Sequence, residues 1–199
     1  MEQKPLIKVV VIGPESTGKS TMCKLLAQHY NTQWCPEFAR EFLLAHGMDY
    51  TYDDLLYIAR GQVDLEDKYI QLTVDSRQSA VTSITPDPGF QTPNPKLLFI
   101  DTDMYVMKVW CEFVFGKCHE WILEQIRKRK YDLYLLCNID LAWVKDELRE
   151  YPDPAPREKL YAIYKDLMIN QSTPWVEISG NYDERMQKAI KAVDQLIAG

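Results

Sequence analysis

Eight consecutive residues near the start of the chain have the types and spacing of a phosphate-binding loop. They read Gly-Pro-Glu-Ser-Thr-Gly-Lys-Ser at positions 13–20 and fit the pattern G-x-x-x-x-G-K-[ST]. Backbone N–H groups in such a loop can point together at one anion, and the following helix adds the positive end of its dipole. The residues expected to bind ATP are Gly13, Glu15, Ser16, Thr17, Gly18, Lys19, Ser20 and Thr21.

Individual positions in this loop have distinct chemical tasks. Gly13 and Gly18 permit backbone angles and a close approach that a Cβ atom would block. Lys19 places a positive charge between the β- and γ-phosphates, and Ser20 offers a hydroxyl to Mg²⁺. Glu15 places an acid inside an anion site, so we expect its side chain to point away from the phosphates.

The segments on either side of the loop supply the context that the motif requires. Residues 6–12 are mostly apolar and β-branched, as in a buried parallel strand. Apolar residues at positions 22, 25, 26 and 30 have helical spacing. A chance match of four fixed positions is the alternative, and the strand–loop–helix context argues against it.

Three acids are expected at the ends of neighbouring strands. Asp101 ends an apolar run that begins at Leu97 and would hold Mg²⁺ through water, with a helix cap as the alternative role. Glu37 follows a short strand at 33–36, and Asp103 lies two residues beyond Asp101. Either Glu37 or Asp103 could accept the proton of an acceptor hydroxyl, or could instead cap a helix or form an ion pair.

Residues near these acids extend the expected site. Arg40 lies one helical turn after Glu37, so the two can face the same pocket or bridge each other on the surface. Gly180 and Asn181 follow the fifth predicted strand and are expected to contact ATP. Asn181 and Glu184 also have the spacing of a capping box that begins the last helix.

A lid is predicted over about residues 145–157. A helix at 142–150 is followed by a proline-rich break and by a second helix at 157–170. Arg149 and Arg157 would close on the transferred phosphoryl group and exclude water. The alternative is that these arginines are solvated residues of two surface helices.

Strands alternating with helices predict one α/β domain over 1–199, with a five-stranded parallel sheet and helices on both faces. The expected strands are 6–12, 33–36, 96–101, 132–137 and 175–178. Helices are expected at 22–30, 37–47, 53–75, 104–115, 119–130, 142–150 and 157–170, and from Asn181 onward. Residues 76–96 contain four prolines and are interpreted as a long loop. Ligands of such sheets bind at the carboxyl ends of the strands, where the candidate residues converge.

The composition of the sequence limits the kinds of partner and cellular location that we expect for the protein. The 199 residues carry a net charge of −6 and a pI of about 5.1, which disfavours a nucleic-acid binder. Five cysteines without a CxxC pair favour a reduced cytoplasmic protein without a zinc site. No apolar run approaches the length of a membrane span, and we expect no signal peptide because a strand begins almost at once.

Four segments together resemble the ribosylnicotinamide kinase domain of the NadR family. They are residues 13–20, 37–42, 99–103 and 143–149, and their order and spacing match along nearly the whole chain. The resemblance implies a P-loop kinase fold and ATP-dependent phosphorylation of the 5′-hydroxyl of nicotinamide riboside, which gives nicotinamide mononucleotide in NAD salvage. Glu15 is itself a mark of this family.

The resemblance also implies roles for particular residues. Lys19, Glu37, Asp103, Arg149 and Arg157 are the implied catalytic group, and Ser20 and Asp101 the metal ligands. The implied contacts to the nucleoside are Glu37, Arg40, Gln62, Asp103 and Trp110. The three histidines form no H-x-G-H motif, so adenylyl transfer, which NadR proteins perform with a further domain, is not expected.

A second hypothesis is a nucleotide-dependent switch or regulatory ATPase without a metabolic acceptor. A GTPase is disfavoured because the sequence contains neither D-x-x-G nor N-K-x-D. An AAA+ motor is disfavoured because no helical lid domain follows the fifth strand. Acids at two strand ends favour the kinase, since they could serve an acceptor hydroxyl.

Overall fold

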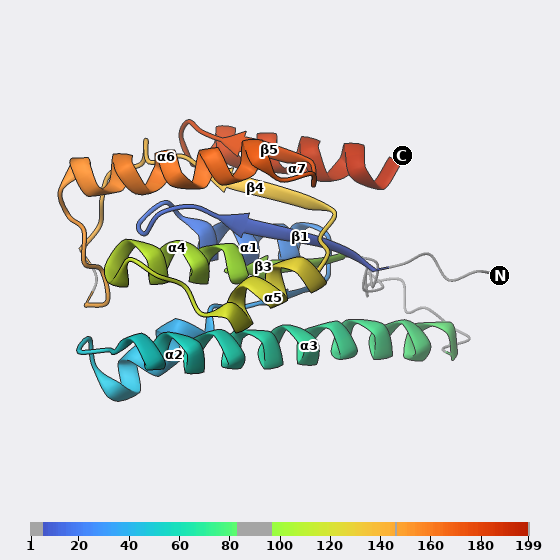
Figure 1. Ribbon diagram of the computed structural model, residues 1–199. Coiled ribbons are helices and arrows are strands. Elements are labelled where there is room, and N and C mark those ends of the chain that lie inside the picture. The colour runs from blue at the N-terminus through green and yellow to red at the C-terminus, as the bar shows by residue number, and fades with distance from the viewer. Residues whose placement is uncertain (1–5, 83–96, 146, 199) are drawn as a thin grey trace.

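Five parallel strands form the centre of the molecule (Figure 1). The computed structural model describes residues 6–82, 97–145 and 147–198. The strands are β1 (Ile7–Ile12), β2 (Gln33–Cys35), β3 (Leu97–Asp101), β4 (Leu133–Cys137) and β5 (Trp175–Ile178). Their order in the sheet is β2-β3-β1-β4-β5, and every neighbouring pair is parallel. The predicted fold class is therefore confirmed, with β1 and its phosphate loop in the middle of the sheet.

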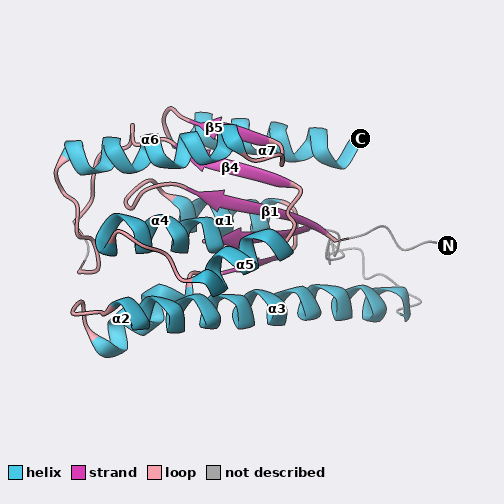
Figure 2. Cartoon of the chain, in the orientation of Figure 1, coloured by secondary structure: helices cyan, strands magenta, loops and turns pink. Residues whose placement is uncertain are grey.

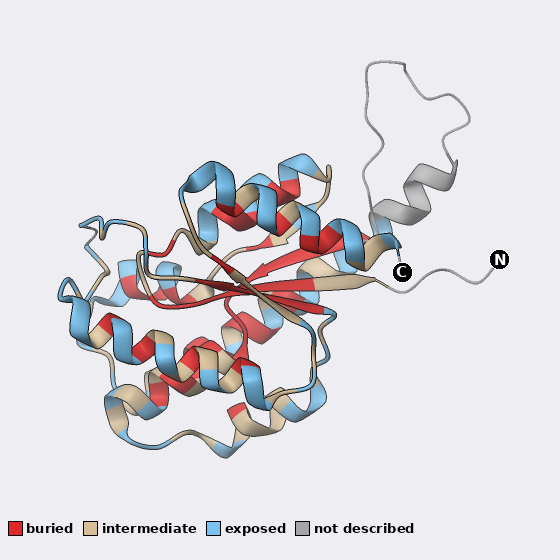
Figure 3. Ribbon diagram, turned by 90° about the horizontal axis from the view of Figure 1, so that it is seen from above, coloured by how far each residue is buried: buried red, intermediate tan, exposed pale blue. Residues whose placement is uncertain are grey.

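Helices cover both faces of the sheet (Figures 2 and 3). Side chains alternate along each strand, so Val9 and Val11 pack under α1 (Lys19–His29) and α7 (Tyr182–Ala198). Val10 and Ile12 pack on the other side, against α4 (Met104–Phe115) and α6 (Pro154–Asn170). All four valine and isoleucine side chains are fully buried, which fixes the position of the loop that follows them.

A third apolar cluster joins the remaining helices to α4. It contains side chains from α2 (Phe38–His46), α3 (Tyr52–Thr82) and α5 (Glu120–Lys128). Gly61 of α3 lies against Phe38, where an added Cβ atom would come within 2.3 Å of the ring. Close packing at this point holds the beginning of α2 against α3. None of the described helices combines the length and the apolar character that a membrane span requires.

The prediction that a loop begins at residue 76 was wrong. The helix expected at 53–75 continues without interruption to Thr82 as α3. Residues 76–82 are rich in Ser and Thr but contain neither glycine nor proline, so nothing in them forces the helix to end. The rest of the predicted loop, 83–96, lies outside the described residues.

The prediction of a helix at 142–150 was also wrong. The described residues of this segment are irregular, and α6 begins at Pro154, three residues earlier than expected. Proline fits the first turn of a helix because the N–H that it lacks would have no helical partner there. The prolines therefore begin α6 instead of separating two helices, and the described residues of the predicted lid are an irregular segment followed by the start of one helix.

Arg185 in the first turn of α7 connects the loops that follow three strands. Its side chain is 1% exposed and donates to the carbonyl oxygens of Thr17 at 3.0 Å, Asn138 at 2.8 Å and Gly180 at 2.9 Å. It also forms an ion pair with Asp140. One guanidinium thus fixes the phosphate loop to the ends of β4 and β5.

Replacing Arg185 with methionine is expected to lower the free energy of unfolding by about 3 kcal/mol. Methionine preserves much of the buried volume but leaves three carbonyl groups and Asp140 without their charged donor. Urea denaturation at pH 7 measures the loss. Lys191→Met, on the exposed face of the same helix, is the matched control and should stay within about 0.5 kcal/mol of the unchanged protein. An Arg185→Met variant as stable as this control would contradict the prediction.

Candidate active site

The phosphate loop has the backbone geometry that its sequence predicts. Gly13 has φ 139° and Gly18 has φ 79°. A Cβ atom at Gly13 would lie 2.7 Å from the carbonyl oxygen of Cys137, so only glycine fits this close approach to β4. Thr17 closes the loop from within by donating its hydroxyl to the Pro14 carbonyl oxygen at 2.8 Å. Lys19 Nζ donates to the same oxygen at 3.0 Å and therefore lies over the loop.

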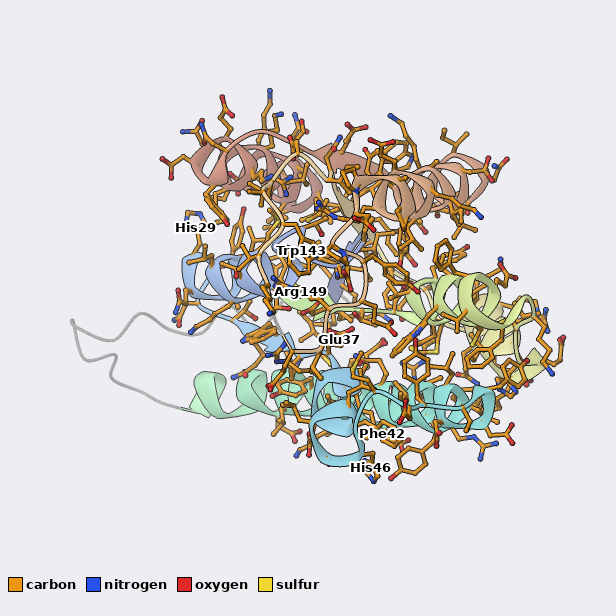
Figure 4. All side chains as sticks on the ribbon, turned by 90° about the vertical axis from the view of Figure 1, so that its left-hand side faces the viewer. His29, Glu37, Phe42, His46, Trp143 and Arg149 are labelled. Carbon is orange, nitrogen blue, oxygen red and sulfur yellow. The ribbon has the colours of Figure 1, made fainter. Side chains whose placement is uncertain are left out.

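A cavity of about 240 Å³ opens beside this loop at the carboxyl ends of the strands. It is lined by residues 13–16 and 18–21, Glu37, Arg40, Trp110, Arg149, Tyr151, Leu160 and Tyr164, among others. Figure 4 looks onto this end of the molecule and shows Trp143, Arg149 and Glu37 gathered near its middle. The cavity thus joins the phosphate loop to an acid, two arginines and aromatic side chains.

Glu37 is placed at the cavity by the short strand β2 and the start of α2. It is the N-cap residue of α2, but its side chain makes no capping hydrogen bond. Its carboxylate instead accepts a hydrogen bond from the Thr102 hydroxyl at 3.3 Å. Thr102 has φ 78°, a conformation that a β-branched residue rarely adopts, and is 1% exposed. This strained turn after β3 brings the hydroxyl to Glu37.

Asp101 at the end of β3 is fully buried, and neither of its oxygens has a hydrogen-bond partner among the described residues. Burial raises the pKa of its carboxyl group to about 7, and the charge of Glu37 adds to the shift. Lys19 and the Ser20 hydroxyl oppose the shift. A buried carboxylate without a partner beside a serine hydroxyl fits a hard cation such as Mg²⁺.

Asp103 occupies a different position from Glu37. Its Oδ1 accepts from the backbone N–H groups of Tyr105 at 3.0 Å and Val106 at 3.3 Å, so it caps α4. Its Oδ2 accepts from the Tyr134 hydroxyl at 2.8 Å. The side chain is 1% exposed, does not line the cavity, and has its pKa raised to about 7 mainly by burial. The structure therefore brings Glu37, and not Asp103, to the cavity.

Of the three arginines expected at the site, two line the cavity, and Arg157 is buried outside the lining. Arg40 and Arg149 line it, and Arg149 donates to the Val144 carbonyl oxygen. Arg157 is 6% exposed in the first turn of α6, and its Nε and one terminal nitrogen have no hydrogen-bond partner among the described residues. Leu160 and Tyr164, three and seven residues later on the same helix face, line the cavity.

The two residues expected to contact the nucleoside from other helices differ in position. Trp110 lines the cavity from α4, and its indole N–H donates to the Tyr50 hydroxyl at 2.9 Å. Gln62 is buried in α3 and lies outside the cavity lining. Its Oε1 accepts from the Phe38 N–H at 2.7 Å and its Nε2 donates to the Pro36 carbonyl oxygen at 3.3 Å. Gln62 therefore fixes the backbone around Glu37.

Gly180 and Asn181 lie on the other side of the phosphate loop. The Gly180 N–H donates to Asp140 at 2.6 Å, and Asn181 forms the predicted capping box with Glu184. The next residue, Tyr182, lines a small cavity of about 20 Å³ together with residues of the loop and α1. Neither Gly180 nor Asn181 lines the larger cavity.

Sequence reasoning missed Thr102 and Arg185. Thr102 lies between Asp101 and Asp103, and no local sequence pattern predicts its positive φ. Arg185 falls at a position where an exposed helical cation is the ordinary expectation, yet it is almost fully buried. A charged residue on the apolar face of the last helix was the one available signal, since α7 packs its buried side against the sheet.

Comparison with known proteins identifies a family and several relatives of the chain. A family model described as "AAA domain" matches residues 8–185. The trifunctional NAD biosynthesis/regulator protein NadR of Salmonella typhimurium is 25% identical, over 98% of this chain and 44% of NadR. The NadR of Escherichia coli strain K12 is 26% identical with the same coverage. The resemblance to NadR is thus confirmed, and the chain spans less than half the length of these relatives.

Solved structures show the same fold. A crystal structure of NadR in complex with NR has a TM-score of 0.74 at 21% identity, covering 98% of this chain and 50% of that one. A NadR complex with NAD and AMP-PNP has a TM-score of 0.67 at the same identity and coverage. Thymidylate kinase from Ehrlichia chaffeensis has a TM-score of 0.57 at 13% identity and covers 96% of this chain and 100% of its own. The fold is that of the P-loop kinases.

Proposed function

This chain belongs to the AAA-domain family, and from that premise we propose that it is an ATP-dependent kinase that phosphorylates a small nucleoside. One observation carries the proposal: Glu37, from the end of β2, lines the same cavity as the phosphate loop. A phosphate site alone would serve any nucleotide-binding protein. A carboxylate in the same cavity gives an acceptor hydroxyl somewhere to lose its proton.

In the proposed reaction the phosphate loop binds the donor and Glu37 serves the acceptor. The loop N–H groups and Lys19 hold the phosphates of ATP and offset charge on the transferred group. Glu37 accepts the proton of the acceptor hydroxyl. At the same time the hydroxyl oxygen bonds to the γ-phosphorus of ATP, and the bond between that phosphorus and ADP breaks. Thr102 orients the carboxylate by donating to it.

Arg157 and Arg149 would bind the transferring phosphoryl group. Arg157 is buried with two nitrogens that lack partners among the described residues, and such a cation is costly unless an anion reaches it. Its position one turn before the cavity-lining Leu160 makes the transferred phosphoryl group the natural partner. Arg149 lies on the irregular segment that replaces the predicted helix.

Asp101 and Ser20 would hold Mg²⁺. The fit rests on the two unpartnered, buried oxygens of Asp101 and on the adjacent hydroxyl. When bound, the ion would neutralise charge on the donor phosphates. No group of three or more His, Cys, Asp or Glu in the described part of the chain could hold a metal.

For the acceptor we propose nicotinamide riboside, phosphorylated on its 5′-hydroxyl to give nicotinamide mononucleotide. Support comes from the similarity to NadR, one structure of which is a complex with NR. Trp110 offers an aromatic surface to a positively charged ring, and Glu37 and Arg40 offer polar groups to a ribose. The small cavity lined by Tyr182, Thr17 and Thr21 marks the side of the loop where the rest of ATP would lie.

The test is product formation from Mg-ATP and a panel of nucleosides that includes nicotinamide riboside. We expect stoichiometric ADP and nicotinamide mononucleotide, with little product from adenosine, uridine or thymidine. Absence of product from every nucleoside would contradict the kinase. ATP hydrolysis without an acceptor would favour the regulatory ATPase instead.

Asp101→Asn should change how stability depends on pH. Burial raises the pKa of Asp101 from 3.8 to about 7, so the native state binds more protons than the unfolded chain between these values. The contribution of this carboxyl to stability is therefore lost as pH rises from about 4 to about 7. Without Mg²⁺, the free energy of unfolding of Asp101→Asn should fall less steeply with rising pH than that of the unchanged protein. The difference in slope should reach up to about 1.4 kcal/mol per pH unit.

Urea denaturation from pH 4.5 to 7, with and without Mg-ATP, makes the comparison. Asp103 keeps its own raised pKa in both proteins, so the difference between the curves isolates Asp101. Mg-ATP should stabilise the unchanged protein more than the variant, because the variant lacks the carboxylate that would face the ion. Parallel pH curves would contradict the assignment of a buried titrating carboxyl at position 101.

A further inference from the structure

The Glu15 carboxylate in the phosphate loop binds a segment more than 120 residues away. Its Oε1 accepts from the Tyr151 N–H at 2.7 Å and from the Trp143 indole N–H at 3.3 Å. Its Oε2 accepts from the Glu150 N–H at 2.9 Å. The next loop residue, Ser16, accepts the Val144 N–H on its hydroxyl oxygen at 3.0 Å. The phosphate loop therefore grips residues 143–151 at both ends.

These hydrogen bonds account for the presence of an acid, Glu15, in an anion-binding loop. Three N–H donors stabilise the Glu15 carboxylate, and its oxygens therefore face Trp143, Glu150 and Tyr151. The described residues of this segment, 143–145 and 147–151, are irregular and belong to no helix or strand. Since Arg149 lies inside it and lines the cavity, the position of that arginine depends on the grip.

A chain of hydrogen bonds links Glu150 to Trp110, which lines the cavity from α4. The Tyr50 hydroxyl lies 3.0 and 3.2 Å from the two carboxylate oxygens of Glu150, to which it donates. Tyr50 in turn accepts the indole N–H of Trp110 at 2.9 Å. A side chain expected to contact the acceptor is thus joined, through Tyr50 and Glu150, to the loop that holds the donor.

We propose that Glu15 is a positioning residue that latches residues 143–151 over the phosphate loop, and that Glu150 and Tyr50 couple this latch to Trp110. Binding at Trp110 would fix Tyr50 and Glu150, and would thereby favour the closed latch that presents Arg149 to the phosphates. ATP and the acceptor would each raise the affinity for the other. The coupling rests on the proposed function, whereas the latch does not.

Residue-resolved amide hydrogen exchange tests the latch without any assay of activity. Glu15→Ala should speed exchange of the Glu150 and Tyr151 amides by at least about tenfold, because each loses a charged acceptor. The amides of β1 report that the fold is intact. Glu158→Ala, an exposed acid on α6, is the matched control and should leave all of these amides unchanged.

Unchanged exchange at both amides in folded Glu15→Ala would overturn the latch. Should that variant fail to fold, Glu15→Gln retains the shape but not the charge, and faster exchange at both amides is again expected. Equal exchange in Glu15→Gln and the unchanged protein would then overturn it.

Calorimetry with AMP-PNP and Mg²⁺ tests the coupling. The affinity for AMP-PNP should rise when nicotinamide riboside is present, and Tyr50→Phe should reduce that rise at least about threefold while the affinity for AMP-PNP alone stays the same. An equal rise in Tyr50→Phe would overturn the coupling. Failure of nicotinamide riboside to bind would contradict the proposed acceptor, and the exchange result would still decide the latch.

Discussion

Lys19→Ala is expected to lower kcat by about 100- to 1000-fold with nicotinamide riboside as acceptor. Lys19 lies over the phosphate loop, held 3.0 Å from the Pro14 carbonyl oxygen, where its ammonium can reach phosphate oxygens. The loss falls mainly on kcat, because charge on the transferred group is redistributed during reaction while the loop N–H groups still bind ATP. Steady-state kinetics with saturating Mg-ATP measures the effect.

Lys24→Ala supplies the comparison for Lys19→Ala. Lys24 belongs to the same helix but is exposed, so its removal should change kcat by less than about twofold. Equal thermal stability of the two variants would show that the loss of activity in Lys19→Ala does not result from unfolding. A Lys19→Ala variant with kcat within tenfold of the unchanged protein would contradict the donor site proposed here.

Glu37→Gln is expected to lower kcat by about 100-fold or more, with little change in KM. The amide retains the shape and can still accept from Thr102, but it cannot take the proton of the acceptor hydroxyl. A change confined to KM would assign Glu37 to acceptor binding instead.

Asp103→Asn is the matched variant, because it removes one carboxylate from the neighbouring strand end. Asparagine also caps helices well, so the bonds to Tyr105 and Val106 can persist. We expect kcat within about threefold of the unchanged protein and a modest change in stability from the altered contact with Tyr134. A larger loss of kcat in Asp103→Asn than in Glu37→Gln would reverse the two roles.

Local patterns were sufficient to predict the donor half of the site. The loop at 13–20, its strand and the capping box at Asn181 depend on residues close together in the chain, and each is found as expected. Strands β1, β3 and β4 were also predictable, since buried parallel strands are mostly continuous apolar runs.

Contacts between residues far apart in the sequence determine the parts of the site that local patterns did not predict. A helix was expected at 142–150, but the Trp143 indole N–H and the Val144 backbone N–H donate to Glu15 and Ser16 of a distant loop. The choice between Glu37 and Asp103 depends on Tyr134, which comes from another strand. Neither contact has a signature within the segment itself, because the partners are separated by 31 to 128 residues.

The central position of β1 has a consequence for the entropy of ligand binding. Ladders on both sides of β1, with β3 and β4, and the Arg185 contact fix the phosphate loop before any nucleotide arrives. Ordering a backbone costs about 1–2 kcal/mol per residue, and the loop has already met that cost during folding. Binding of a nucleotide should therefore add little ordering cost at the loop, so variants around Gly13 should change the stability of the fold more than the entropy of binding.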